Sequence, residues 1–115
     1  MRTNLTKKEI IRKKKDIDSL FRYGKRISAP GLRIVFRKNE LGYTRGFFTL
    51  VRKFGNSIQR NRAKRLIKEV FRIQKHELEP GWDLAFILFP GNTDFHDLNQ
   101  QVSKLFSRAG LFFNH

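Results

Sequence analysis

Cysteine is absent from the 115-residue chain, which excludes disulfide bonds, thiolate nucleophiles and cysteine-based zinc sites. No apolar run approaches the ~20 residues that a membrane-spanning helix needs. Residues 1–11 also lack the apolar stretch of about 7–15 residues that is typical of a secretory signal. These absences lead us to expect a cytoplasmic protein that does not enter a membrane.

Acidic side chains are scarce, with 10 against 25 lysines and arginines, and there are only 3 histidines. The groups that could act as an acid, a base or a metal ligand are His76, Glu77, Glu79, Asp83, Asp94, His96 and Asp97. A histidine at the end of a basic helix complements the helix dipole, and an aspartate before a helix caps it. No HExxH pair or phosphate-binding loop occurs. We therefore predict no catalytic residue and no metal site in the protein.

The positive charge is concentrated in the first part of the chain. Residues 1–72 carry 22 of the 25 basic side chains and 5 of the 10 acidic ones, whereas residues 73–115 are nearly neutral. Such a one-sided distribution suits binding to a polyanion. Nucleic acid is the expected partner, and an anionic membrane is the weaker alternative.

One predicted helix holds much of this charge. Apolar positions recur with helical spacing and comprise Ala63, Leu66, Ile67, Val70, Phe71 and the adjoining Gln74. The opposite side carries Asn61, Lys64, Arg65, Lys68 and Arg72, with Arg60 and Arg62 on its flanks. The pattern predicts a helix that packs one side into a core and holds a rigid row of cations outward.

The start of this helix is also recognisable. Gly55 is a turn residue, and Asn56 and Ser57 are favourable caps, so the helix is predicted to begin near Ile58. Its first turn presents free N–H groups and the positive end of the helix dipole. Arg52 and Lys53 approach from the preceding segment, which makes this end suitable for a phosphate.

The segments before the basic helix are predicted less sharply. Residues 7–15 form a charged run that we interpret as a solvated or flexible arm that becomes ordered on RNA. A short helix follows and ends near Gly24. Residues 32–37 and 46–51 have the pattern of strands, and a hairpin between them is the simplest arrangement.

The strand at residues 32–37 has two different faces. Leu32, Ile34 and Phe36 alternate with Arg33, Val35 and Arg37. The arginines either solvate an exposed sheet face or border a groove whose far wall is the basic helix. The alternation of residues is compatible with both arrangements.

After the basic helix, residues 82–89 are almost continuously apolar, which indicates a strand buried on both sides. Asp94 or Asp97 can then cap a last helix that runs to about Ala109. Helices covering one sheet make an α+β two-layer sandwich. We predict a single domain over residues 1–115, with a basic arm at about residues 1–15.

The basic helix also carries a family resemblance. Its Gly55-Asn56, Arg60-Asn61-Arg62, Lys64-Arg65-Leu66-Ile67 and Phe71 resemble the Arg-Asn-Arg signature of the bacterial ribonuclease P protein family. Residues 20–24, 84–89 and 98–111 are similar to the end of that family's first helix, its last strand and its closing helix. The resemblance therefore extends over nearly the whole chain.

The resemblance implies a four-stranded, mostly antiparallel sheet with a left-handed βαβ crossover, like a domain of a ribosomal protein. It also implies a ribonuclease P holoenzyme in which a catalytic RNA holds the active site and Mg²⁺. This endonuclease removes the 5′ leader of precursor tRNA to give the mature tRNA 5′ end. The implied partners are that RNA and the leader, with no DNA and no membrane.

The resemblance assigns two sets of residues. Contacts with RNA are expected from Arg52, Lys53, Asn56, Arg60, Asn61, Arg62, Lys64, Arg65 and Lys68. A cleft for the leader is expected to contain Ile17, Phe21, Arg33, Val35 and Arg37. Asn61 can bond a base edge or a sugar, or orient a hydrated metal ion.

Two features of the cleft stay open on the sequence. Phe21 can stack on an unpaired base or fill the core. Ile17 and Val35 stand where members of the family often have aromatic residues. The rival function is a structural RNA-binding protein, such as a ribosomal protein, that takes no part in turnover.

Overall fold

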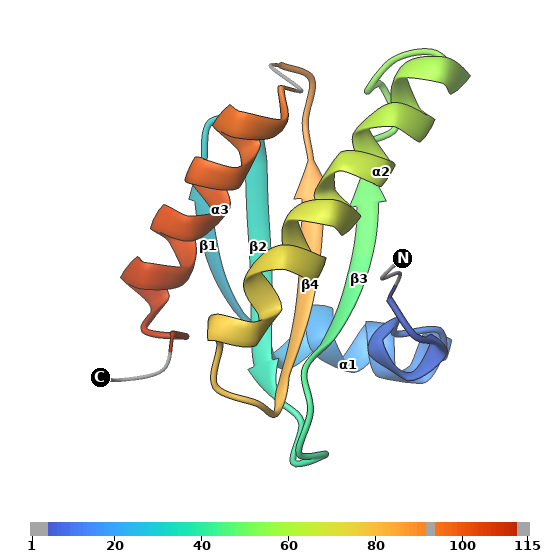
Figure 1. The fold of residues 1–115 in the computed structure, drawn as a ribbon. Helices are drawn as coiled ribbons and strands as arrows, with labels where there is room; N and C mark the ends of the chain where they lie inside the picture. The colour runs from blue at the N-terminus through green and yellow to red at the C-terminus, as the bar shows by residue number, and fades with distance from the viewer. Residues whose placement is uncertain (1–4, 92–93, 113–115) are drawn as a thin grey trace.

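The computed structural model describes residues 5–91 and 94–112, which form an α+β fold around one four-stranded sheet (Figure 1). In chain order the elements are the 3₁₀ turn η1 (Lys7–Glu9), α1 (Lys14–Tyr23), β1 (Lys25–Ala29), β2 (Leu32–Lys38), β3 (Arg45–Leu50), α2 (Ser57–Gln74), the 3₁₀ turn η2 (Lys75–Glu77), β4 (Trp82–Leu88) and α3 (Phe95–Ala109). The predicted α+β class is confirmed.

The strand order is β1-β2-β4-β3, with β1–β2 and β2–β4 antiparallel and β3–β4 parallel. The predicted hairpin between residues 32–37 and 46–51 is wrong, because β4 lies between these two strands. The hairpin in the structure joins β1 to β2 through Pro30 and Gly31. Strand β1 has a weak apolar pattern, so it is recognised only from its pairing.

The β3-α2-β4 connection is left-handed. In Figure 1, α2 lies in front of the sheet, β3 points upward, and β4 lies to the left of β3. A right-handed connection, the usual form, would place β4 on the other side of β3. The crossover implied by the family resemblance is therefore present.

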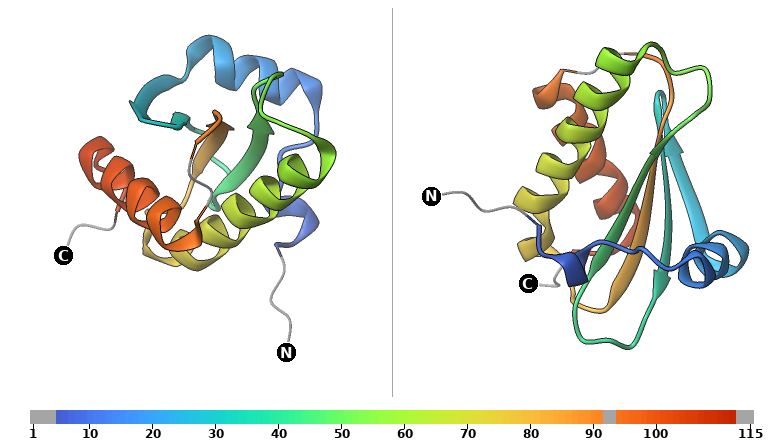
Figure 2. Two further views of the ribbon diagram at one scale, coloured as in Figure 1. Left: turned by 90° about the horizontal axis from the view of Figure 1, so that it is seen from above. Right: turned by 90° about the vertical axis from the view of Figure 1, so that its right-hand side faces the viewer.

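Helices α2 and α3 cover one face of the sheet (Figure 2). Their side chains enclose an aromatic core in which the Phe48 and Phe86 rings stack with centroids 5.4 Å apart. Phe71 from α2 and Phe106 from α3 pack against Phe86 at 5.7 and 6.1 Å. Because all four rings are buried, this cluster fixes both helices against the sheet.

Helix α1 partly covers the opposite face (Figure 2). A smaller cluster there contains Leu20 from α1, Val35 from β2 and Ala85 from β4, all fully buried. Gly24 permits the close approach at the end of α1, since an added Cβ would lie 2.7 Å from the Val35 side chain. This contact fixes the position of α1 on the sheet.

Residues 5–13 are anchored on the protein through Ile10 and Ile11, so a flexible arm is wrong for this segment, although its basic side chains are exposed, as a solvated arm requires. Ile10 forms a β-bridge with Gly46 at the edge of β3, and the Ile11 amide donates to the Gly46 carbonyl at 2.9 Å. The Ile11 side chain is 2% exposed. An ion pair between Glu9 and Lys75 attaches the same segment to the end of α2.

A polar network connects α1 to the sheet beneath it. Arg45 donates to both carboxylate oxygens of Asp83, from Nε at 2.9 Å and Nη2 at 2.8 Å. Its Nη1 also contacts Asp16 of α1 at 3.5 Å. Hydrogen bonding to Asp83 raises the pKa of Arg45, so the guanidinium stays charged. Asn39 adds a hydrogen bond to Asp83 at 2.8 Å.

We expect Asp83→Asn to lower the free energy of unfolding by about 2–3 kcal/mol, because it leaves the Arg45 charge nearly buried without its main partner. Chemical denaturation of the purified protein measures this change. Asp18→Asn, on the exposed side of α1, is the control and should change stability by less than about 0.5 kcal/mol. Equal effects of the two substitutions would contradict a structural role for the network.

Candidate RNA-binding surface

The first turn of α2 is held by a reciprocal cap. The backbone N–H of Gln59 donates to Asn56 Oδ1 at 2.9 Å, and the backbone N–H of Asn56 donates to Gln59 Oε1 at 3.1 Å. Helix α2 begins at Ser57, one residue before the predicted start. A Cβ at Gly55 would lie 2.3 Å from Gln59 Oε1 and would displace this oxygen from the cap. The side-chain oxygen of Asn56, an expected RNA contact, is therefore used to cap the helix.

Arg60 holds the loop that leads into α2. Its Nη1 donates to the carbonyl oxygens of Val51 and Arg52, at 3.0 and 3.2 Å. Phe54 is almost fully buried and anchors the other side of this loop. As a result, the exposed side chains of Arg52 and Lys53 lie on an ordered loop beside the first turn of α2.

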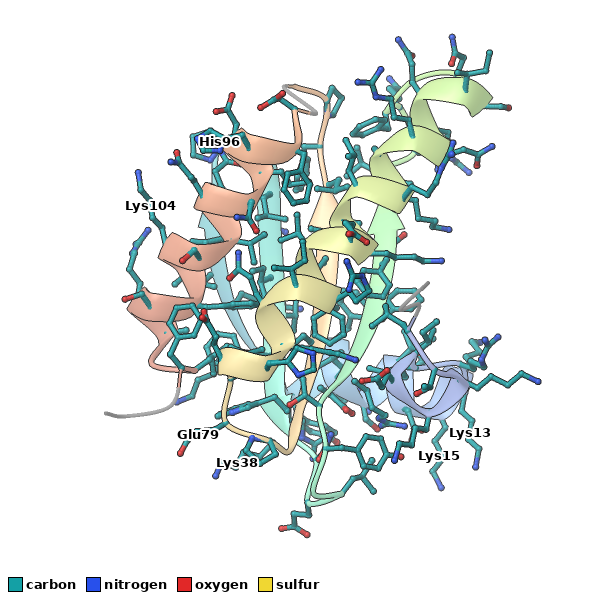
Figure 3. All side chains as sticks on the ribbon, in the orientation of Figure 1. Lys13, Lys15, Lys38, Glu79, His96 and Lys104 are labelled. Carbon is teal, nitrogen blue, oxygen red and sulfur yellow. The ribbon has the colours of Figure 1, made fainter. Side chains whose placement is uncertain are left out.

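Beyond the first turn, α2 has the two sides that its sequence predicts. Ala63, Ile67 and Val70 are fully buried against the core. The expected RNA-binding side chains on the outer side are exposed except for Lys68, which is half-buried; they are Asn61, Arg62, Lys64, Arg65 and Lys68. Figure 3 shows nitrogen-tipped side chains projecting around this part of the helix. We refer to these five residues as the α2 stripe.

The lower end of the cationic side differs from the prediction. Arg72 forms a hydrogen-bonded ion pair with Glu69, one turn earlier on the same helix. Hydrogen bonding from Arg72 lowers the pKa of the Glu69 carboxyl. The charge of Arg72 is therefore partly compensated within the helix.

The five residues predicted to form the leader cleft do not share one environment. Val35 is fully buried beneath α1, so its place in a binding cleft is wrong. Ile17 and Phe21 are half-buried at the edge of the same cluster. Arg33 and Arg37 are exposed, and Arg37 lies over the ring of Tyr23 at 5.0 Å from its centroid.

The groove expected between β2 and the basic helix is also absent from the described residues. Arg33 and Arg37 project from the sheet face that α1 partly covers, whereas α2 packs on the other face. The sheet itself therefore separates these arginines from most of the α2 stripe.

A further group of side chains, not predicted from the sequence, lies on the α1 side of the sheet. Phe47 of β3 packs edge-on against Phe21, with ring centroids 6.1 Å apart. Next to it, Thr49 and Ile87 pair in register and are both half-buried. The signal was present in the adjacent Phe47 and Phe48, because consecutive strand residues face opposite sides of a sheet.

This side of the sheet forms a continuous surface. By register, Arg33 of β2 lies beside Ile87 of β4, which lies beside Thr49 of β3. Both Phe47, which contacts Phe21, and the loop carrying Arg52 adjoin the Thr49 end of this row, one before and the other after Thr49 along the chain. We call Phe21, Arg33, Phe47, Thr49 and Ile87 the α1-side surface.

The described residues contain neither a cluster of metal ligands nor a helix that could span a membrane. Within residues 5–91 and 94–112, no three histidine, aspartate or glutamate side chains gather in a way that could hold a metal ion. No helix in the same ranges is long and apolar enough to cross a bilayer. Two of the acidic candidates are in structural positions: Asp83 binds Arg45, and Asp94 caps α3.

Sequence comparison identifies close relatives. The Ribonuclease P family model matches residues 5–110. A "Ribonuclease P protein component" from Syntrophus aciditrophicus is 37% identical over 107 residues, covering 90% of this chain and 89% of the relative. The protein of the same description from Caldanaerobacter subterraneus is 30% identical over 114 residues, covering 97% and 96%.

Solved structures agree with these relationships. The RNase P protein from Thermotoga maritima, in complex with 1-(4-fluorophenyl)-2-thiourea, has a TM-score of 0.78 and 30% identity, covering 85% of this chain and 97% of that one. The Staphylococcus aureus RNase P protein has a TM-score of 0.81 at 20% identity, covering 91% and 98%, and this similarity concerns the fold. The chain therefore belongs to the ribonuclease P protein family and is the protein component of an endoribonuclease that contains RNA.

Proposed function

We propose that the α2 stripe and the loop before it bind phosphates of the RNA subunit, and that the α1-side surface binds the 5′ leader of precursor tRNA. Binding of phosphates by α2 is supported by its row of outward cations, which lies on a helix whose other side is buried. Because the helix already fixes the backbone that carries these charges, less conformational freedom is lost when RNA binds.

Arg52, Lys53, Arg62, Lys64 and Arg65 are the side chains best placed for phosphates, because all five are exposed. Asn61 lies among them and offers both a donor and an acceptor to a base edge, a sugar or a hydrated ion. Arg60 has a different role in this proposal, since its guanidinium already binds two carbonyl oxygens and thereby positions the loop.

The α1-side surface suits a single strand. The half-buried rings of Phe21 and Phe47 can contact unpaired bases of the leader, and the exposed Arg33 can contact its phosphates. Stacking on aromatic rings tolerates any base sequence, which fits leaders that differ between tRNAs. Val35 contributes from beneath by supporting α1.

The hydrolytic chemistry is assigned to the RNA subunit with its bound Mg²⁺, and the protein assists by neutralising charge and holding the leader. This proposal places the protein in the cytoplasm with precursor tRNA. A purely structural RNA-binding role is disfavoured by the family relationship, because the relatives are components of an endoribonuclease.

We expect binding to the RNA subunit to depend strongly on salt. With about six phosphate contacts, a plot of log K against log[salt] should have a slope of about −4 to −5. Lys64→Ala should make this slope shallower by about 0.7–0.9, since one contact is lost. Filter binding over a range of KCl concentrations measures both values.

Lys104→Ala is the matched control, because Lys104 is an exposed cation on α3, away from the α2 stripe (Figure 3). It should leave the slope unchanged. A wild-type slope shallower than about −2, or equal effects of the two substitutions, would contradict the assignment to α2.

We expect Phe21→Leu to weaken capture of leader-bearing precursor tRNA by the holoenzyme about tenfold, which lies within the usual value of one base–aromatic stack. Leucine keeps the apolar packing of this half-buried position, so assembly and affinity for leaderless mature tRNA should hardly change. Equilibrium binding of both tRNAs at fixed salt measures the difference.

Phe36→Leu is the control, because Phe36 is also half-buried and packs edge-on against a ring, that of Trp82, on the other face of the sheet. It should affect both tRNAs equally or not at all. If Phe21→Leu also weakened the two tRNAs equally, Phe21 would be a packing residue and the leader would lie elsewhere.

A further inference from the structure

A second feature adjoins the α2 stripe: a groove with a volume of about 550 Å³ between residues 5–10 and α2. Among the described residues, its apolar lining comprises Leu5, Ile10 and Leu66. The polar lining in the same ranges comprises Arg65, Lys68, Glu69 and Arg72. The volume falls within the range of about 300–1,000 Å³ typical of sites for small organic groups.

Leu66 is an apolar residue of the groove that the fold leaves partly uncovered. Its helical spacing predicts a core residue, and it packs against the main core, yet the side chain remains half-exposed. Leu5 is likewise half-buried against that core. Partly wetted apolar side chains next to strong cations gain from covering by a group that is itself both apolar and anionic.

Both sides of the groove are fixed in the protein alone. The Ile10–Gly46 bridge and the Glu9–Lys75 ion pair hold residues 5–10 in place. The Thr6 backbone N–H and hydroxyl also donate to the Glu9 carboxylate, at 2.9 and 3.1 Å. Burial raises the pKa of the Glu9 carboxyl, but the hydrogen bonds from Lys75 and Thr6 outweigh it, so the pKa is lowered and Glu9 stays charged near neutral pH. A preformed groove loses little conformational freedom when it binds.

From these features we propose that the groove receives an unpaired nucleobase of the RNA subunit. A base has flat apolar faces for Leu5 and Leu66, and its ribose carries phosphates that Arg65 and Lys68 can bind. Within the described residues, neither of these two cations forms an ion pair. An apolar protein segment would leave both charges unmatched, and the charge balance therefore favours RNA.

This inference rests on the proposed function and extends it, because Arg65 and Lys68 belong to the α2 stripe. Phosphate contacts carry no sequence information. A groove that accepts an unpaired base, in contrast, selects one position along the RNA. The groove would thus fix the register of the RNA subunit along α2.

The test is chemical probing of the RNA subunit, with reagents that modify the base edges of all four nucleotides, at saturating protein. The wild-type protein should protect one unpaired nucleotide near the α2 stripe. Leu66→Ala and Leu5→Ala should each abolish that protection and weaken RNA binding about tenfold. Their salt slopes should equal that of the wild type, since no charge is removed.

Ile73→Ala is the matched control, because Ile73 is a 44% exposed apolar residue on the same helix but outside the groove. It should keep the protection. Using two groove variants from different segments guards against a loss of α2 folding, and a thermal melt of each free protein checks this directly.

Protection that persists in both groove variants, or that is missing with the wild type, would overturn the inference. If the groove variants instead changed the oligomeric state of the protein and left the protection of the RNA unchanged, the groove would bind a second copy of the chain. That result would also overturn the inference. The salt slope of Lys64→Ala separates the two levels: if it shifts while Leu66→Ala has no effect, only the groove assignment fails.

Discussion

The pairing of β4 with both β2 and β3 is the constraint on which the rest of the structure depends. Leu84, Phe86 and Leu88 of this strand face the core under α2 and α3, whereas Ala85 lies beneath α1. A shift of β4 by one residue would move every side chain of the strand to the opposite face of the sheet. The three large core residues would then lie on the α1 side, which is only partly covered. The positions of α1 and α2 relative to each other are therefore fixed through β4.

The sequence predicts local features well, because their causes are local. The α2 start is correct within one residue, since Asn56 and the helical spacing act within one or two turns. The hairpin between residues 32–37 and 46–51 is wrong for the opposite reason. Inserting β4 between these strands depends on a left-handed crossover, which no pattern of residues in the strands encodes.

The candidate sites follow the same division. Exposed cations of the α2 stripe could be identified because a helix that buries one side must present the other. Val35 could not be identified as buried, since its exposure depends on how closely α1 approaches at Gly24. The flexibility predicted for residues 5–13 is wrong because the prediction followed their high charge. Their order instead depends on two apolar neighbours, Ile10 and Ile11, which anchor the segment at Gly46.

The arrangement of the two surfaces limits how RNA can approach. Helix α2 and the α1-side surface lie on opposite faces of the sheet, so one RNA segment cannot lie flat against both. They come closest where the chain passes from β3 into α2, at the loop that Arg60 holds through the carbonyl oxygens of Val51 and Arg52. A leader bound on the α1 side and an RNA subunit bound along α2 would therefore both adjoin this loop. Under the proposed function, the loop that Arg60 holds would therefore set the position of the leader relative to the RNA subunit.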